Sequence, residues 1–279
     1  RRGGCRWRDA GLAYNRRALY PHRAGWAQDH PAFSLLNMHP YVLAPRRPAA
    51  RLFARLGLIW LAVLATPSHA ASPMVTDDAR IVDARACQVE SWVTSYRGST
   101  EYSIQPACNI TGNLELALGS TRTNAHGHSQ TTDVVLQGKM VLRPLQANGW
   151  GLALAAGSVG HPQAAARRDW YAYAPVSFSL RDDALQVHAN VGWLRDGAAR
   201  RDRLTWGLGT EIQLSARAWL LAETFGQNQG RPMHQLGLRY SLVPDRVQLD
   251  ATDGNRNGTH LRERWFSIGL RLLTPAFLP

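Results

Sequence analysis

Lysine is almost absent from this chain: Lys139 is the only one in 279 residues, and arginine supplies the rest of a basic excess that gives a formal net charge of +12. Eleven arginines and two aspartates give residues 1–70 a net charge of +9, which leaves +3 for residues 71–279. A nucleic-acid-binding protein gathers its basic residues on one face or element. The arginines after residue 70 are scattered instead, so the sequence excludes nucleic acid as a partner.

Long hydrophobic runs and catalytic motifs are missing too. No stretch after residue 70 reaches the roughly 18 consecutive apolar residues that indicate a membrane-spanning helix. The chain contains no G-x-S-x-G motif and no spaced pair of acidic residues typical of hydrolases. We therefore expect neither a transmembrane helix nor an enzyme.

Residues 38–70 follow the order of a secretory signal peptide. Several arginines precede the apolar run 56–65, and the small-x-small sequence Ser68-His69-Ala70 follows it. The run is too short to span a bilayer, which needs about 20 residues. We predict cleavage after Ala70 or Ala71 and export through the general secretory route. The alternative is that residues 38–65 form a helix of the folded protein.

Cysteine is scarce, with three in the chain, and Cys5 falls in residues 1–37, which we interpret as a disordered or non-native leader. The other two, Cys87 and Cys108, would reach an oxidising compartment after export, where a pair of cysteines predicts a disulfide. If Arg97-Gly98 forms a hairpin turn, Cys87 lies directly opposite Cys108. Facing positions on antiparallel strands have the short Cβ separation that a disulfide requires. The alternative is a pair of free thiols.

The chain after residue 70 shows a repeated alternation of apolar residues with polar or small ones. Val134, Leu136 and Met140, for example, share one face of an extended segment whose other face carries Asp133 and Lys139. Ten segments have this period of two: 113–122, 133–143, 150–158, 170–180, 185–193, 204–214, 218–224, 236–242, 247–251 and 266–272. The hairpin between the cysteines adds two weaker segments. The pattern predicts an all-β fold of about 12 antiparallel strands, or 10 if that hairpin lies outside the sheet.

A closed barrel and a soluble β-sandwich both alternate in this way, so the connections and the second face decide between them. Tight turns such as Pro244-Asp245 alternate with longer polar loops such as 120–130 and 195–203, as in outer-membrane barrels. The second face, meaning the side of each segment opposite its apolar residues, is rich in glycine and alanine with few charges. The solvent face of a sandwich carries many charges instead. Six tryptophans lie near segment ends, a placement typical of a membrane–water boundary: Trp150, Trp170, Trp193, Trp206, Trp219 and Trp265. The sequence favours the barrel.

These segments resemble bacterial outer-membrane β-barrel proteins as a class, well over residues 113–279 and loosely over 85–110. The resemblance implies an antiparallel up-and-down transmembrane β-barrel over residues 85–279, with a periplasmic segment at 71–84. It also implies a location in the Gram-negative outer membrane, with membrane lipid and the barrel-assembly machinery as partners. In this class the last strand usually ends on an aromatic residue that the machinery reads, and here Phe277 is third from the end.

Polar residues of the second face are the candidates for lining the barrel lumen. They are Glu115, Asp133, Lys139, His188, Glu211, Glu223, Arg239, Asp250 and Arg271. Their mixed signs predict ion pairs that line or narrow the lumen, which with about 12 strands is intermediate between a filled small barrel and an open porin. We therefore expect a porin-like channel for small solutes. The alternative is a structural or surface-interaction barrel without transport, and the oligomeric state is not indicated.

Two less favoured hypotheses concern chemistry. A lipid-modifying enzyme could use His188 with Glu211 or Glu223 at one rim. Its nucleophile would be Ser177 or Ser179, although no motif supports one. Histidines in predicted loops could bind a transition metal, and they are His126, His128, His161 and His260. Loop histidines are more often solvated, so we expect no metal and no cofactor.

Overall fold

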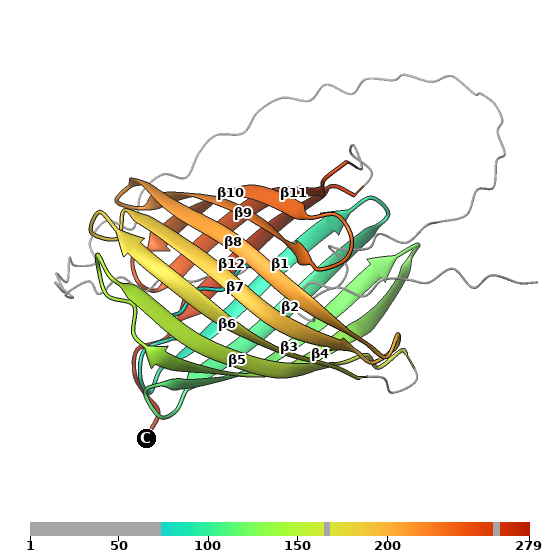
Figure 1. Cartoon of the computed structure of the whole chain (residues 1–279), viewed down its shortest axis with the longest axis horizontal. Coiled ribbons are helices and arrows are strands. Elements are labelled where there is room, and N and C mark those ends of the chain that lie inside the picture. The colour runs from blue at the N-terminus through green and yellow to red at the C-terminus, as the bar shows by residue number, and fades with distance from the viewer. Residues whose placement is uncertain (1–73, 165–167, 259–262) are drawn as a thin grey trace, which may run out of the picture. The chain divides into compact units, whose positions relative to one another are not determined.

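The computed structural model describes residues 74–164, 168–258 and 263–279. Within these ranges twelve strands form a closed antiparallel barrel, in which each strand pairs with its sequence neighbours and β12 pairs back to β1 (Figure 1). The strands are β1 (Cys87–Tyr96), β2 (Ser99–Asn109), β3 (Leu114–Ala125), β4 (His128–Arg143), β5 (Trp150–Gly160), β6 (Arg168–Leu180), β7 (Leu185–Asp196), β8 (Arg201–Ser215), β9 (Ala218–Gln227), β10 (Met233–Val243), β11 (Val247–Arg256) and β12 (Trp265–Leu273). The predicted up-and-down barrel is confirmed, with 12 strands and the first hairpin inside the sheet.

The predicted leader over residues 1–37 and the predicted signal peptide over 38–70 lie outside the described residues. In the part of the chain that the structure describes, no helix is long and apolar enough to cross a membrane.

The barrel wall has an apolar outer face and a polar inner face. In β4, Leu136 is 58% exposed, whereas the neighbouring Gln137 and Lys139 point inward and are buried. The other strands repeat this alternation, for example β8 with exposed Leu204 and Leu208. A soluble sandwich buries its apolar face against a second sheet. The opposite arrangement here is that of a barrel whose wall contacts lipid.

Four of the six tryptophans predicted at the membrane boundary lie on the outer face; Trp170 is the most exposed of the six at 52%. The prediction was wrong for Trp219 and Trp265, which are buried on the inner face. Trp265 is only 2% exposed, packs near Phe225 and donates its indole N–H to Gln235. Position near a strand end does not determine the face, because the face depends on whether a residue is odd or even along its strand.

Several connections at one end of the barrel are shorter than predicted. β3 and β4 continue to a two-residue turn at His126-Gly127, within the loop predicted over 120–130. The two turn residues have φ values of 53° and 77°, as a tight hairpin turn requires. The connection predicted at 195–203 shortens to residues 197–200. The strands here keep pairing through polar residues, which look like loop residues in the sequence.

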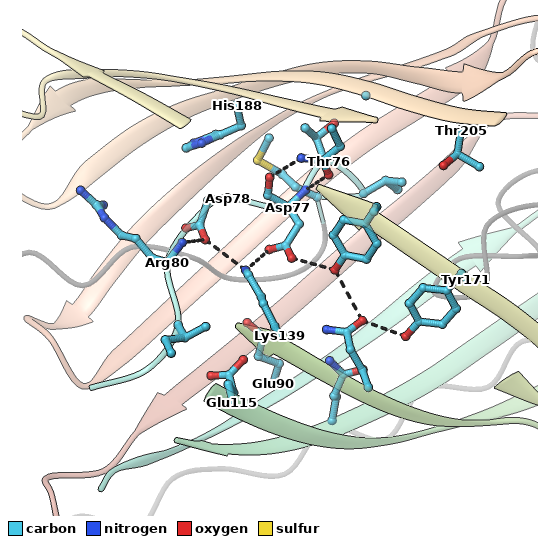
Figure 2. A pocket seen from close by; sticks show the side chains of 18 of the residues that line it. Thr76, Asp77, Asp78, Arg80, Glu90, Glu115, Lys139, Tyr171, His188 and Thr205 are labelled. Carbon is cyan, nitrogen blue, oxygen red and sulfur yellow. Dashed lines mark hydrogen bonds and ion pairs between the residues drawn. The ribbon is translucent and has the colours of Figure 1, made fainter. Parts of the chain in front are cut away.

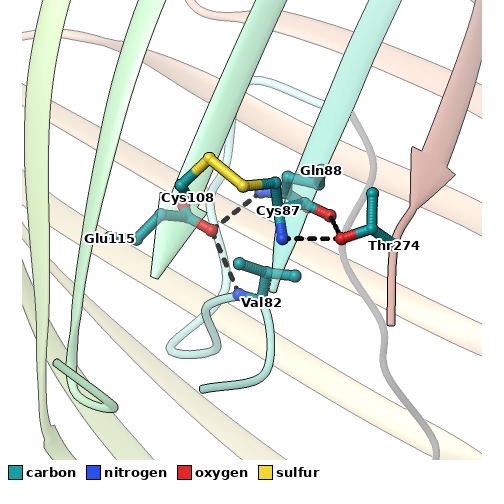
Figure 3. The surroundings of a disulfide bond; sticks show 6 residues. All are labelled: Val82, Cys87, Gln88, Cys108, Glu115 and Thr274. Carbon is teal, nitrogen blue, oxygen red and sulfur yellow. Dashed lines mark hydrogen bonds between the residues drawn. A yellow bond between two sulfur atoms is a disulfide. The ribbon is translucent and has the colours of Figure 1, made fainter. Parts of the chain in front are cut away.

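The disulfide lies where the barrel closes. Cys87 and Cys108 are directly paired between β1 and β2, with their Cα atoms 4.1 Å apart, and form the predicted bond (Figure 3). The backbone N–H of Cys87 donates to Thr274 Oγ, just after the end of β12. Beyond β12, the N–H of Phe277 donates to the carbonyl of Arg85. The chain end is therefore attached to the start of β1, and Phe277 lies outside the last strand.

Candidate functional site

Residues 74–84, which we call the inner segment, run inside the barrel (Figure 2). Residues 74–82 are buried or half-buried, and residues 83 and 84 are exposed. The sequence predicts a periplasmic location for residues 71–84, but the backbone of residues 75–82 hydrogen-bonds to inward-facing side chains of the barrel wall. An isolated extended segment in a narrow lumen must find partners for its backbone N–H and C=O groups. The wall supplies them.

Side chains of the wall accept hydrogen bonds from the backbone of the inner segment. The N–H groups of Val75 and Thr76 donate to the two carboxylate oxygens of Glu223, at 2.8 and 2.7 Å. Further along, the N–H groups of residues 77, 79 and 82 donate to Asn190, Ser177 and Glu115. These acceptors come from β9, β7, β6 and β3, so the inner segment crosses the lumen from one side of the wall to the other.

Charged side chains reinforce this attachment. Lys139, on β4, lies 2.8 Å from Asp77 Oδ1 and 3.5 Å from Asp78 Oδ1 through its Nζ atom (Figure 2). Tyr173 donates its hydroxyl to the other oxygen of Asp77 at 2.8 Å. The guanidinium of Arg80 lies 3.4 Å from Asp183, in the turn between β6 and β7. The only lysine of the chain thus pairs with two residues that the sequence analysis placed outside the barrel.

The residues expected to line the lumen lie on the inner face of the wall and divide into groups. Arg239 pairs with Glu211 at 2.7 Å and with Asp250 at 2.9 Å. Arg271 contacts Gln88 and lies 3.7 Å from Glu90. A third group forms hydrogen bonds or ion pairs with the inner segment and not among its own members: Glu115, Lys139 and Glu223. Asp133 lies 2.7 Å from His161, away from these groups.

A cavity of about 110 Å³ remains in the lumen beside the inner segment, enough for several water molecules. Both the inner segment and the wall contribute to its lining. Asp77, Asp78 and Arg80 come from the inner segment, and Lys139 and His188 come from the wall. The sequence does not mark the first three as lumen residues, because residues 74–84 show no period-two alternation and their partners are far away in sequence.

The predicted serine–histidine–glutamate set does meet, but inside the lumen. Ser177 Oγ lies 2.8 Å from His188 Nδ1, and His188 Nε2 lies 3.8 Å from Glu211 Oε1. The Ser177 hydroxyl also accepts the N–H of Ala79, and Ser177 is fully buried. A nucleophile must reach the reacting carbon of its substrate, and this hydroxyl faces neither lipid nor open lumen. The arrangement holds the inner segment.

The histidines proposed as metal ligands do not come together in the described residues. His161 is buried between Asp133 and Asp169, at 2.7 and 3.2 Å. His126 lies in the β3–β4 turn, His128 begins β4, and His260 falls outside the described residues. Among the residues that the structure describes, no group of three or more histidine, cysteine, aspartate or glutamate side chains could hold a metal ion.

Comparisons with known proteins agree with this architecture. A family model described as "Uncharacterised conserved protein UCP029691" matches residues 59–273. No curated protein matches the sequence. Among solved structures, the KdgM porin has a similar fold, with a TM-score of 0.52 and 10% identity over 66% of this chain and 98% of that chain.

Two further solved barrels have comparable similarity. The COG4313 outer membrane channel from Pseudomonas putida F1 gives a TM-score of 0.51 at 12% identity, over 74% of this chain and 100% of that chain. The NanC porin gives 0.50 at 10% identity, over 67% of this chain and 98% of that chain. At these identities the likeness shows that the chain has the fold of outer-membrane channel proteins.

Proposed function

The chain belongs to this family, UCP029691, and we propose that it is an outer-membrane channel for small solutes, exported through the general secretory route. The observation that carries the proposal is the wall of the closed barrel, with apolar side chains outside and polar side chains around a cavity inside. In hydrocarbon the lumen of such a barrel offers a polar route across the membrane. The shared fold with two porins and an outer-membrane channel supports transport over a purely structural role.

The inner segment makes this a narrow channel. It occupies the lumen and leaves a cavity of about 110 Å³, so passage is limited to small solutes unless the segment moves. Membrane lipid would cover the outer face, and the barrel-assembly machinery would insert the chain by way of its C-terminal strand β12. The lipid-facing side chains of β12, such as Phe266 and Ile268, are exposed as that role requires.

The test is the conductance of the refolded protein in planar lipid bilayers. We expect small discrete channels, and a several-fold larger conductance for Glu223→Gln. Val75 and Thr76 donate to different oxygens of Glu223, and glutamine replaces one of these acceptors with an NH2 donor, so one of the two N–H groups loses its acceptor. Asp253→Asn, an equal change on the outer face, is the matched control and should leave the conductance unchanged.

Folding is checked separately by heat-modifiable migration in gels. If the folded protein and its folded Glu223→Gln variant both gave no conductance, the channel proposal would be wrong. A structural or surface-interaction barrel would then be the better account.

A further inference from the structure

The cavity in the lumen has a definite chemical character. Five carboxylates contribute to its lining, and they belong to Asp77, Asp78, Glu90, Glu115 and Glu211. Three basic side chains accompany them, those of Arg80, Lys139 and Arg271. With His188 neutral, the lining carries a net charge of −2, although the chain as a whole is basic.

The cationic groups of this lining are already engaged by acids. Lys139 lies between Asp77 and Asp78, and Arg271 contacts Gln88 and lies 3.7 Å from Glu90. Glu115, in contrast, accepts from two neutral donors, the N–H of Val82 and the amide of Gln88. Both donors are uncharged, so they add no positive charge to this part of the lining. The cavity therefore keeps a negative potential, which a low-dielectric wall strengthens.

Two unsatisfied hydrogen-bond acceptors in the lining point the same way. Asp78 Oδ2 and Gln105 Oε1 are buried acceptors without a hydrogen-bond partner among the described residues. His188 Nε2 is also unbonded, 3.8 Å from Glu211 Oε1, and His188 is 1% exposed. Arg271 Nη1 is an unbonded donor in the same lining, on the guanidinium beside Glu90. Buried polar atoms without partners are costly, so acceptors of this kind fit a ligand that brings donors.

We propose that the lumen cavity binds and passes small cations that carry N–H donors, such as primary ammonium groups, and disfavours anions. The proposal deepens the channel function and rests on it. A positive charge is complementary to the net negative charge of the lining, and N–H groups can donate hydrogen bonds to the free acceptors of Asp78 and Gln105.

The first experiment measures reversal potentials of the full chain in bilayers under a KCl gradient. We expect K⁺ to permeate about threefold or more better than Cl⁻, because the field of the lining concentrates cations. Asp78→Asn removes one charge and places a donor in the cavity, so the ratio should fall towards one. Asp202→Asn makes the same chemical change on the exposed outer side of the barrel, where Asp202 pairs with Arg195, and should leave the ratio unchanged.

Glu115→Gln provides a second variant in case Asp78→Asn fails to fold. It keeps the side-chain shape and should also lower the ratio. Absence of any conductance would contradict the channel function itself. Conductance with equal or greater Cl⁻ permeability would leave the channel standing and overturn the cation preference, as would a ratio that neither lumen variant changes.

The second experiment tests whether the cavity recognises N–H donors of the cation. It replaces K⁺ with methylammonium or with tetramethylammonium, which has no N–H group. We expect methylammonium to permeate better, and the difference to shrink in Gln105→Leu, which removes a free acceptor with little change in size. If Gln105→Leu left the difference unchanged, ion size alone would explain it, and recognition through N–H donors would be wrong.

Discussion

Single side chains of the wall act as acceptors for the backbone of another part of the chain. Ser177 shows this most clearly, because its hydroxyl receives the N–H of Ala79 and contacts His188. Ser177, His188 and Glu211 could be mistaken for a hydrolytic site. Their burial and the distance of 3.8 Å between His188 and Glu211 favour a structural role.

Replacement of Ser177 by alanine distinguishes the two roles. The change leaves the buried N–H of Ala79 without its acceptor, so we expect the protein to lose about 1–3 kcal/mol of unfolding free energy. Urea unfolding in lipid vesicles measures this loss, and Ser91→Ala on the outer face of β1 serves as the control. Lipid hydrolysis by the wild type that disappears in Ser177→Ala with unchanged stability would contradict the structural role.

The sequence could predict which side of a strand faces inward but not what a side chain meets there. Alternation assigns Glu115 and Glu223 to the lumen, since each lies opposite apolar neighbours in its strand. Nothing local indicates that both accept from backbone amides of residues 75–82. Trp219 and Trp265 show the converse error, because a residue type was given more weight than its place in the alternation.

At the scale of elements, strands could be predicted and the inner segment could not. Strands repeat a two-residue pattern, so a window of about ten residues is enough to recognise one. The facing positions of Cys87 and Cys108 follow from the length of a single hairpin. The inner segment has no such pattern. Its hydrogen bonds reach up to 148 residues along the chain, from Val75 to Glu223, so only the folded barrel reveals its place.

A designed disulfide tests whether the inner segment must move for solutes to pass. A Cβ atom added at Gly207 would lie 3.3 Å from the Cβ of Thr76, close to the roughly 3.5–4.5 Å found in disulfides. We expect the double variant Thr76→Cys/Gly207→Cys to conduct less than the wild type when oxidised and to recover in reductant. The wild type in reductant controls for Cys87–Cys108. Equal conductance in both redox states of the cross-linked variant would show that the segment stays fixed during conduction.

At the scale of the whole molecule, one distribution of residues underlies every other conclusion. The barrel turns its apolar side chains outward and encloses its charged ones, as Leu136 and Lys139 illustrate on a single strand. This arrangement is stable when hydrocarbon surrounds the wall, because the backbone of a closed barrel leaves no unpaired strand edge in lipid. The same distribution gives the lumen its charge and makes it the route for solutes.

The most direct measurement compares spin labels at two adjacent positions of β4, Leu136→Cys and Gln137→Cys, in lipid vesicles. Leu136 is 58% exposed on the outer face and Gln137 is buried on the inner face. We predict that the label at position 136 collides with oxygen dissolved in the lipid and is protected from a water-soluble nickel chelate, and that the label at position 137 is not in contact with lipid. Free access of the chelate to position 136, in a protein that stays monodisperse without detergent, would contradict the account.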